Sequence, residues 1–194
     1  MSLVLGLGNP GERYARTRHN VGWRVVEGLA GRWKARAHET TALYRSWQAV
    51  VAEREVVLLI PLTFMNASGA ALASWLERHA AGAEGLLVVA DDVYLPAGTL
   101  RVRERGSSGG HRGLESIEAA LGGPDYARLR IGVGAAAGEG LRDHVLGEPE
   151  GDDERRLDEA IGLAMEAVEC WAREGVLAAM NRFNRRAGKE VSEP

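Results

Sequence analysis

The chain has 194 residues, of which 45% are hydrophobic and 26% charged, and a formal net charge of −3, which suits one compact domain. No apolar run approaches the roughly 20 residues that a membrane-spanning helix needs, and we expect no secretory signal before the Gly-rich sequence after Leu7. Cys170, the single cysteine, cannot form an internal disulfide, and the five histidines lack metal-ligand spacing. We therefore exclude membrane proteins, disulfide scaffolds and zinc modules, and expect a cytoplasmic protein.

The predicted elements begin with a short apolar run at Leu3–Leu7, which indicates a buried strand. Apolar side chains at four-residue steps predict a helix over Val21–Trp33. Tyr44–Ala52 and Glu55–Ile60 are predicted strands joined by a tight turn, and Ser68–His79 is a predicted helix.

The second half of the chain continues the same alternation. Strands are predicted at Leu86–Ala90, Thr99–Arg105 and Leu129–Val133, and helices at Gly113–Leu121, around Leu157–Trp171 and at Val176–Phe183. These elements predict one α/β domain over residues 1–186, a three-layer fold with a mixed central sheet flanked by helices. We expect residues 187–194 to form a polar, frayed tail.

Charge is uneven along the chain. Residues 1–36 carry seven Arg or Lys against two Glu, a balance of +5, whereas residues 139–169 carry three Arg against eleven acids, a balance of −8. A second basic zone contains arginines and no lysine, namely Arg101, Arg103, Arg105, Arg112, Arg128 and Arg130. Because guanidinium groups bind phosphates through paired hydrogen bonds, such a local basic face can hold a polyanion on an acidic protein.

Two glycine-rich segments match known patterns. The segment from Gly6 to Gly11 matches the dinucleotide pattern Gly-x-Gly-x-x-Gly, but the residues after it lack a helical apolar face. We interpret it as a tight loop whose glycines adopt unusual backbone angles and present Asn9 beside a pocket. Gly106-Ser-Ser-Gly-Gly110 matches a nucleophile elbow with Ser108 as nucleophile, although the preceding strand is not buried and apolar. A serine esterase using Asp143 and His144 remains an alternative.

Polar side chains also lie at the ends of several apolar elements, where loops meet, namely Asn9, His19, Asn20, Asn66 and Asp91. A carboxylate that ends a buried strand, as Asp91 does, needs a partner that offsets its desolvation, and the imidazole of His19 is a suitable one. An Asp–His pair without an evident nucleophile indicates a general base that acts on water. Carboxamides such as Asn9 and Asn66 can then position the substrate and stabilise an oxyanion.

Together these segments resemble the bacterial peptidyl-tRNA hydrolase family over most of the chain. The resemblance rests on five ordered motifs, at residues 6–20, 61–69, 91–98, 109–114 and 128–134. It implies hydrolysis of the ester between a peptide and the 3′ ribose of tRNA, which recycles tRNA from prematurely released ribosomal products. It also implies a monomer that needs no metal, no organic cofactor and no obligate protein partner.

The resemblance assigns roles to individual residues. His19 matches the family's catalytic base, Asp91 its supporting carboxylate, and Asn9 the asparagine that helps to distinguish blocked from free aminoacyl-tRNA. Other positions match residues that contact the tRNA end, the adjoining peptide or the path of the tRNA acceptor stem, namely Tyr14, Phe64, Met65, Asn66, Arg101, Arg103 and Arg130.

The chain departs from the family pattern at two positions. Arg112 stands where the family usually has asparagine. Because a guanidinium cannot accept a hydrogen bond, any acceptor role at this position is lost. We expect Arg112 to hold a phosphate of the terminal nucleotides instead. Tyr94 replaces an acid, and we expect only a local structural contact to change.

Several alternatives stay open. Asn66 could instead cap the helix predicted over residues 68–79, and His111 could cap the next helix, so His111 stays outside the predicted catalytic set. The segment 134–151 could form a mobile lid over the site. An RNA-binding module without catalytic activity is the alternative from another class.

Overall fold

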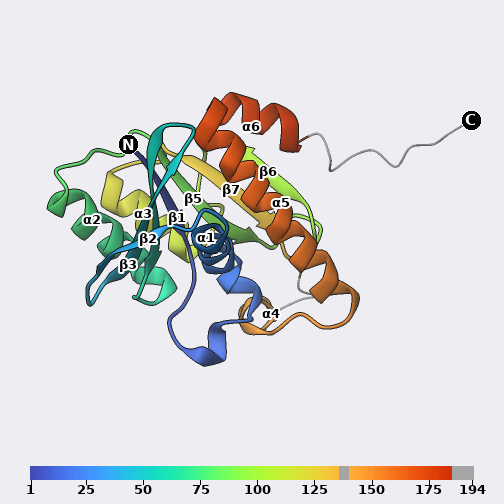
Figure 1. Cartoon of the computed structure of the whole chain (residues 1–194). Coiled ribbons are helices and arrows are strands. Elements are labelled where there is room, and N and C mark those ends of the chain that lie inside the picture. The colour runs from blue at the N-terminus through green and yellow to red at the C-terminus, as the bar shows by residue number, and fades with distance from the viewer. Residues whose placement is uncertain (136–139, 185–194) are drawn as a thin grey trace, which may run out of the picture.

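The computed structural model describes residues 1–135 and 140–184. Its centre is a seven-stranded sheet of order β2-β3-β4-β1-β5-β7-β6 (Figure 1). The strands are β1 (Ser2–Gly6), β2 (Arg36–Thr40), β3 (Tyr44–Val51), β4 (Arg54–Pro61), β5 (Leu86–Asp92), β6 (Leu100–Arg103) and β7 (Ala127–Gly132). The α-helices are α1 (Val21–Arg32), α2 (Ser68–Arg78), α3 (Arg112–Leu121), α4 (Leu141–Leu146), α5 (Asp152–Glu174) and α6 (Val176–Phe183).

The sheet is mixed, and its central strands share one direction. β4, β1, β5 and β7 are parallel neighbours, whereas β2, β3 and β6 add antiparallel pairings at the two edges. The four parallel strands therefore all end on the same side of the sheet, which we call the carboxyl edge. In open α/β sheets, ligands bind at this carboxyl edge.

Helices cover both faces of the sheet, which makes three layers (Figure 1). α1, α5 and α6 pack on one face around Val4, Leu58 and Val89, and α2 and α3 pack on the other around Leu5 and Val88. This two-sided burial explains why the central strands read as continuous apolar runs. The predicted α/β fold class is confirmed.

The structure differs from the predictions in several places. β2 was not predicted, because this edge strand is mostly exposed and polar. The turn between β3 and β4 lies at Ala52 and Glu53, one residue earlier than predicted, and both residues have a positive φ, of 49° and 64°. Such angles suit the two-residue turns that match the twist of a hairpin.

Two glycines at the end of β1 and in the loop after it are required by close packing against α1, which the sequence did not indicate. A Cβ atom on Gly6 would overlap the carbonyl of Gly22, and one on Gly8 would overlap the ring of Trp23. Among the three loop glycines, only Gly11 has a positive φ, of 111°. The expectation of unusual angles is therefore wrong for Gly6 and Gly8, which allow α1 to pack closely against the loop.

Within the described residues, no helix is long and apolar enough to cross a bilayer. The domain boundary expected at residue 186 and the tail expected over residues 187–194 lie outside the described residues.

Candidate active site

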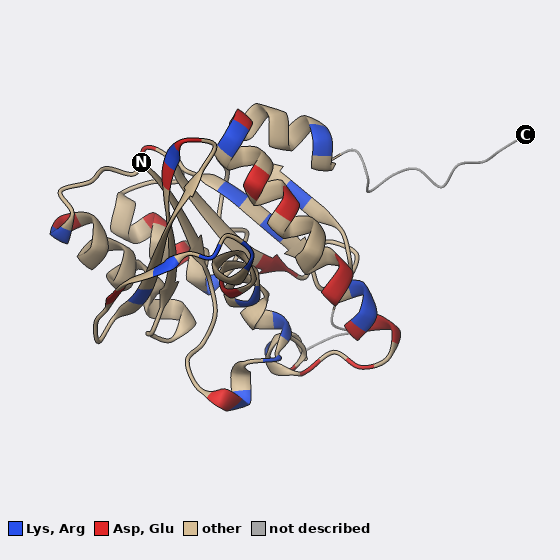
Figure 2. Cartoon of the chain, in the orientation of Figure 1, with Lys and Arg blue, Asp and Glu red and all other residues tan. Residues whose placement is uncertain are grey.

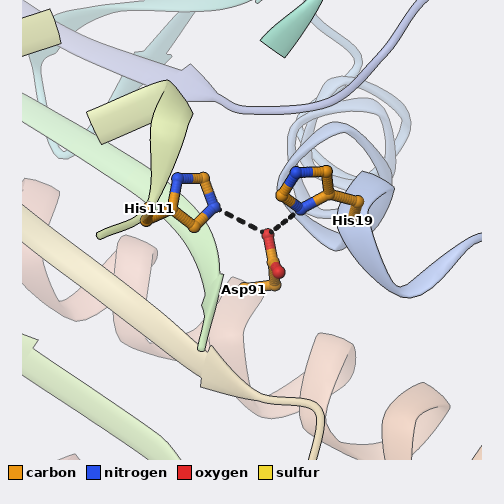
Figure 3. A group of neighbouring side chains, drawn as sticks. All are labelled: His19, Asp91 and His111. Atoms are coloured by element: carbon orange, nitrogen blue, oxygen red, sulfur yellow. Dashed lines mark hydrogen bonds and ion pairs between the residues drawn. The ribbon is translucent and has the colours of Figure 1, made fainter. Parts of the chain in front are cut away.

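Three side chains from distant parts of the chain meet at the carboxyl edge of the sheet. His19 lies in a short 3₁₀ helix, η2 (Arg18–Asn20), Asp91 near the end of β5, and His111 directly before α3. Asp91 Oδ1 lies 2.7 Å from His19 Nδ1 and 2.8 Å from His111 Nε2 (Figure 3). The structure thus places together the predicted His19–Asp91 pair and adds a second imidazole.

Asp91 is only 1% exposed, and its ionisation depends on the two imidazoles. Burial by itself would raise the pKa of Asp91, but electrostatic attraction to His111 and His19 and the hydrogen bonds from both hold that pKa below its ordinary value. The carboxylate is therefore ionised at neutral pH and accepts both hydrogen bonds.

The surroundings of His111 define where its proton lies. Its Nδ1 accepts hydrogen bonds from the main-chain N–H groups of Gly113 (3.1 Å) and Leu114 (3.3 Å), so the proton is on Nε2, which donates to Asp91. His111 does cap α3, as the sequence left open, and it also belongs to the site, from which the predicted set omitted it. The missed signal was a second histidine beside a glycine pair directly before a helix.

The same hydrogen bonds bear on metal binding. His19, Asp91 and His111 offer three ligand atoms within 4.8 Å of one another. A metal ion on Nε2 of neutral His111 would move the ring proton to Nδ1, which already faces two N–H donors. The donor set of His111 therefore favours a proton over a metal ion.

Asn9 is held beside this group by three hydrogen bonds. Its main-chain N–H donates to Asn20 Oδ1, and Asn20 Nδ2 donates to the Asn9 carbonyl, both at 2.9 Å. Asn9 Oδ1 accepts from the main-chain N–H of Met65 at 2.8 Å. Because Oδ1 is occupied, the amide presents Nδ2 as a hydrogen-bond donor at the cleft.

A cleft of about 580 Å³ opens above these residues. Nine of the eleven predicted site residues line it, namely Asn9, Tyr14, His19, Phe64, Met65, Asn66, Asp91, Arg112 and Arg130. Tyr14 and Phe64 form one wall as an edge-to-face pair with ring centroids 6.5 Å apart. The cleft also contains side chains that the sequence did not predict as site residues, namely Asp92, Val93, Tyr94, His111, Leu141, Arg142, Val145 and Leu146.

The structure settles one alternative for this region and shows where part of a second one lies. Asn66 is exposed, and Ala67 occupies the N-cap position of α2 without a side-chain hydrogen bond, so the capping role considered for Asn66 is wrong. Within the segment considered as a lid, Leu141–Leu146 form α4 at the cleft, and residues 136–139 lie outside the described residues.

The predicted basic residues have different surroundings. Arg112 is exposed at the cleft. Arg130 is paired with Asp92 at 3.0 Å and also donates to main-chain carbonyls of the glycine loop. Arg101 and Arg103 are exposed on the edge strand β6 and do not line the cleft. Arg128, counted in the same basic zone, is 1% exposed and lies over the Tyr126 ring, so it is not part of a free basic face.

Three of the seven basic residues of the amino-terminal segment pair with acids of the acidic segment. Arg16 pairs with Glu154, Arg24 with Asp158 at 2.6 Å, and Arg18 with Asp153 at 3.6 Å. Figure 2 shows acidic residues along α5 and basic residues beside its amino-terminal end. Part of the positive charge of residues 1–36 is therefore balanced by ion pairs with residues 153–158.

The residues of the serine-esterase alternative do not form a catalytic group in the structure. Ser108 does not line the cleft, and its carbonyl accepts a hydrogen bond from Arg130 at 2.6 Å. His144 Nε2 lies 3.0 Å from the Gly134 carbonyl and 3.2 Å from the Val133 carbonyl instead of facing Ser108.

The structure is an α/β fold with a His–Asp–His group at a cleft, an arrangement suited to general-base hydrolysis. A sequence model described as peptidyl-tRNA hydrolase matches residues 3–192. The chain belongs to the peptidyl-tRNA hydrolase family, and the predictions of this family and of an enzyme are confirmed.

Individual relatives agree with this assignment. The chain is 45% identical to peptidyl-tRNA hydrolase of Chloroflexus aurantiacus, covering 95% of this chain and 99% of that protein. It is 41% identical to that of Syntrophomonas wolfei, covering 95% of this chain and 100% of that protein. The crystal structure of peptidyl-tRNA hydrolase from Acinetobacter baumannii superposes with a TM-score of 0.88 at 34% identity, covering 95% of this chain and 94% of that one.

A more distant likeness concerns the fold alone. A Campylobacter jejuni 5′-methylthioadenosine/S-adenosyl homocysteine nucleosidase matches with a TM-score of 0.53 at 11% identity, covering 90% of this chain and 99% of that one.

Proposed function

We propose that this chain hydrolyses the ester between the peptide and the 3′ ribose of tRNA in peptidyl-tRNA, with His19 as the general base that activates water. The observation that carries the proposal is the 2.7 Å contact between His19 Nδ1 and Asp91 Oδ1 at the cleft. Because His19 donates from Nδ1 to the ionised carboxylate, its Nε2 carries a lone pair. Within residues 1–135 and 140–184, no side chain or main-chain group hydrogen-bonds to this Nε2.

The reaction then follows in two steps. Water loses a proton to His19 Nε2 while its oxygen attacks the ester carbonyl carbon, and Asp91 stabilises the imidazolium that forms. The tetrahedral intermediate breaks its bond to the ribose oxygen, which receives the proton from His19. The products are a peptide carboxylic acid, which ionises in water, and tRNA with a free 3′ end.

Asn9 supplies selectivity for blocked substrates in this proposal. Its Nδ2 donates a hydrogen bond to the carbonyl that blocks the amino group of the substrate. A free aminoacyl-tRNA offers an ammonium group at that place, which cannot accept a hydrogen bond. Met65 supports this role because its main-chain N–H keeps Oδ1 of Asn9 occupied.

The substrate's two halves occupy different parts of the surface. Tyr14, Phe64, Met65 and Asn66 form a wall for the peptide or the tRNA end, and Arg112 and Arg130 lie at the cleft beside them. Arg101 and Arg103 hold acceptor-stem phosphates from the exposed side of β6. One copy of the chain suffices, because all three members of the His19–Asp91–His111 group come from it, and we therefore expect a monomer.

The test measures release of labelled N-acetylaminoacyl groups from tRNA. The wild-type chain should release the label and leave free aminoacyl-tRNA intact. His19→Ala should lower kcat by about 10² to 10⁴-fold, with tRNA affinity nearly unchanged. Asp91→Asn should lower kcat less, since the geometry survives.

Controls separate the alternatives. His38→Ala removes an exposed histidine on β2 and should leave kcat unchanged. Turnover of His19→Ala close to wild type would refute the general-base role. Loss of activity in Ser108→Ala with an accumulating acyl-enzyme would favour the esterase, and tRNA binding without turnover by wild type would favour a binding module.

A further inference from the structure

Tyr94 has a large aromatic side chain that is exposed to solvent at the cleft. It lies between β5 and β6, lines the cleft and is 76% exposed. Phe64 and Leu141 are exposed at the cleft to a smaller extent, 55% and 45%, whereas Val50 and Leu177 are exposed elsewhere on the surface. From the sequence we expected only a local structural contact at Tyr94, but a side chain with this exposure contributes little to packing.

The backbone around Tyr94 is fixed by hydrogen bonds, whereas its side chain is exposed to solvent. Asp92 Oδ1 accepts a hydrogen bond from the Tyr94 main-chain N–H at 2.8 Å, and Asp92 Oδ2 accepts from Arg130 at 3.0 Å. The next residue, Leu95, accepts a hydrogen bond through its carbonyl from the Gly134 N–H at 3.1 Å. A ring on such a support can bind a flat partner with little loss of backbone entropy.

The charges around Tyr94 indicate which half of the substrate reaches it. Three arginines line the cleft, namely Arg130, which shares Asp92 with Tyr94, Arg142 of α4 and Arg112 of α3. The wall formed by Asn9, Tyr14, Phe64, Met65 and Asn66 has no charged member, although the Arg13 guanidinium lies over the Tyr14 ring, 4.6 Å from its centroid. Because phosphates need cations, we place the RNA half of a peptidyl-tRNA beside Tyr94 and Arg130, and the peptide half along the wall of uncharged side chains.

We propose that Tyr94 is a specificity-determining residue whose ring stacks on a nucleobase of the single-stranded 3′ end of the tRNA. This inference rests on the proposed function and assigns a contact within the same cleft. Stacking on an aromatic ring is the usual way in which proteins hold unpaired bases, because every base has a π face.

The experiment compares Tyr94 variants on a set of matched substrates. Removal of one stacked base contact typically weakens binding by a factor of about 5 to 150. Tyr94→Ala should therefore raise KM for N-acetylaminoacyl-tRNA within that range and change kcat little. Tyr94→Phe keeps the ring and should remain near wild type, whereas Leu177→Ala, an exposed residue on α6, should have no effect.

A double-mutant cycle identifies the partner. N-acetylaminoacyl oligonucleotides of the 3′ end are made with one base at a time replaced by an abasic site. At one position, the abasic substrate should have a raised KM with wild type, and Tyr94→Ala should raise it no further.

Two outcomes would overturn the inference. An unchanged KM for Tyr94→Ala on every substrate would show that the ring binds nothing. An effect of Tyr94→Ala that persists on all abasic substrates, or that follows the size of the amino-acid side chain, would place the ring on the peptide. A wild-type chain without turnover would instead refute the proposed function, so the two failures are distinguishable.

Discussion

At the scale of single residues, the active site is organised by one carboxylate oxygen. Asp91 Oδ1 accepts hydrogen bonds from both His19 and His111, and the two rings lie 5.1 Å apart between centroids. Because the hydrogen bonds of His111 Nδ1 leave its proton on Nε2, we expect His111 to be a positioning residue that keeps Asp91 in place for His19. In the proposed mechanism, this side chain both caps α3 and supports the base.

Substitution of His111 can separate these two tasks. His111→Ala should lower kcat by about tenfold or more, the effect of a lost hydrogen bond to a charged group, and should lower the free energy of unfolding by about 1 kcal/mol through the lost cap. His111→Asn restores a good N-cap but cannot donate to Asp91 in the same way. It should regain the stability while kcat stays low, as measured by urea unfolding and by turnover. Equal recovery of both would show that His111 acts only as a cap.

Arg112 is the second residue whose role can be tested alone. It is exposed at the cleft, and a phosphate contact there would release counterions when tRNA binds. Arg112→Glu should weaken tRNA binding and reduce the slope of log Kd against log salt by about one. An unchanged slope would refute the phosphate contact, even if KM were altered.

At the scale of elements, a polar cluster far from the cleft joins β2 to α2. Glu39 of β2 accepts hydrogen bonds from the Tyr44 hydroxyl at 2.6 Å and from His79 Nε2 at 3.2 Å, and it pairs with Arg78. The pKa of Glu39 is lowered to about 2, mainly by the hydrogen bond from Tyr44, while burial acts in the opposite direction. The pKa of Tyr44 is raised to about 12, first by burial and then by the hydrogen bond to Glu39. This cluster explains how a polar edge strand stays attached.

The lowered pKa of Glu39 predicts a pH-dependent contribution to stability. The ionised carboxylate stabilises the fold, so its contribution is complete above the ordinary value of 4.5 and is lost as the pH falls through about 2. Glu39→Gln should cost about 1 to 2 kcal/mol of unfolding free energy at pH 7, and the difference from wild type should shrink below pH 4.5. Urea unfolding at several pH values measures this. Glu55→Gln, an exposed change on β4, serves as a control with a cost below about 0.5 kcal/mol.

At the scale of the whole molecule, some arginines form ion pairs within the fold and others are exposed on the surface. Arginines of the amino-terminal segment pair with acids of α5 and the loop before it, whereas Arg101 and Arg103 are exposed on β6 (Figure 2). The net charge of −3 therefore says little about where a polyanion binds, because the local field depends on which charges are already paired.

Two single substitutions that remove the same charge distinguish these surfaces. Arg101→Ala should reduce the salt slope of tRNA binding by about one, since one phosphate contact is lost. Arg24→Ala removes an arginine that is paired with Asp158 and should leave the slope unchanged. Equal effects of the two substitutions on Kd and on the slope would mean that only net charge matters.

The sequence alone determined the fold class and predicted that His19 and Asp91 lie together. Apolar periodicity depends on local backbone geometry, so it identified six of the seven strands and five of the six α-helices within the described residues. Asp91 was recognisable because it ends an apolar strand, and His19 because it lies just before an apolar helix and matches the catalytic base of the family. The polar edge strand β2 and the short helix α4 have no such periodicity and were missed.

The tertiary structure alone decided which side chains meet. It brought His111 to Asp91, paired Arg130 with Asp92 and buried Arg128, and these contacts depend on the order of strands in the sheet. Residues that lie 20 to 72 positions apart become neighbours only when parallel strands place their carboxyl ends at one edge. Local patterns predict the elements, and the packing of the sheet creates the site.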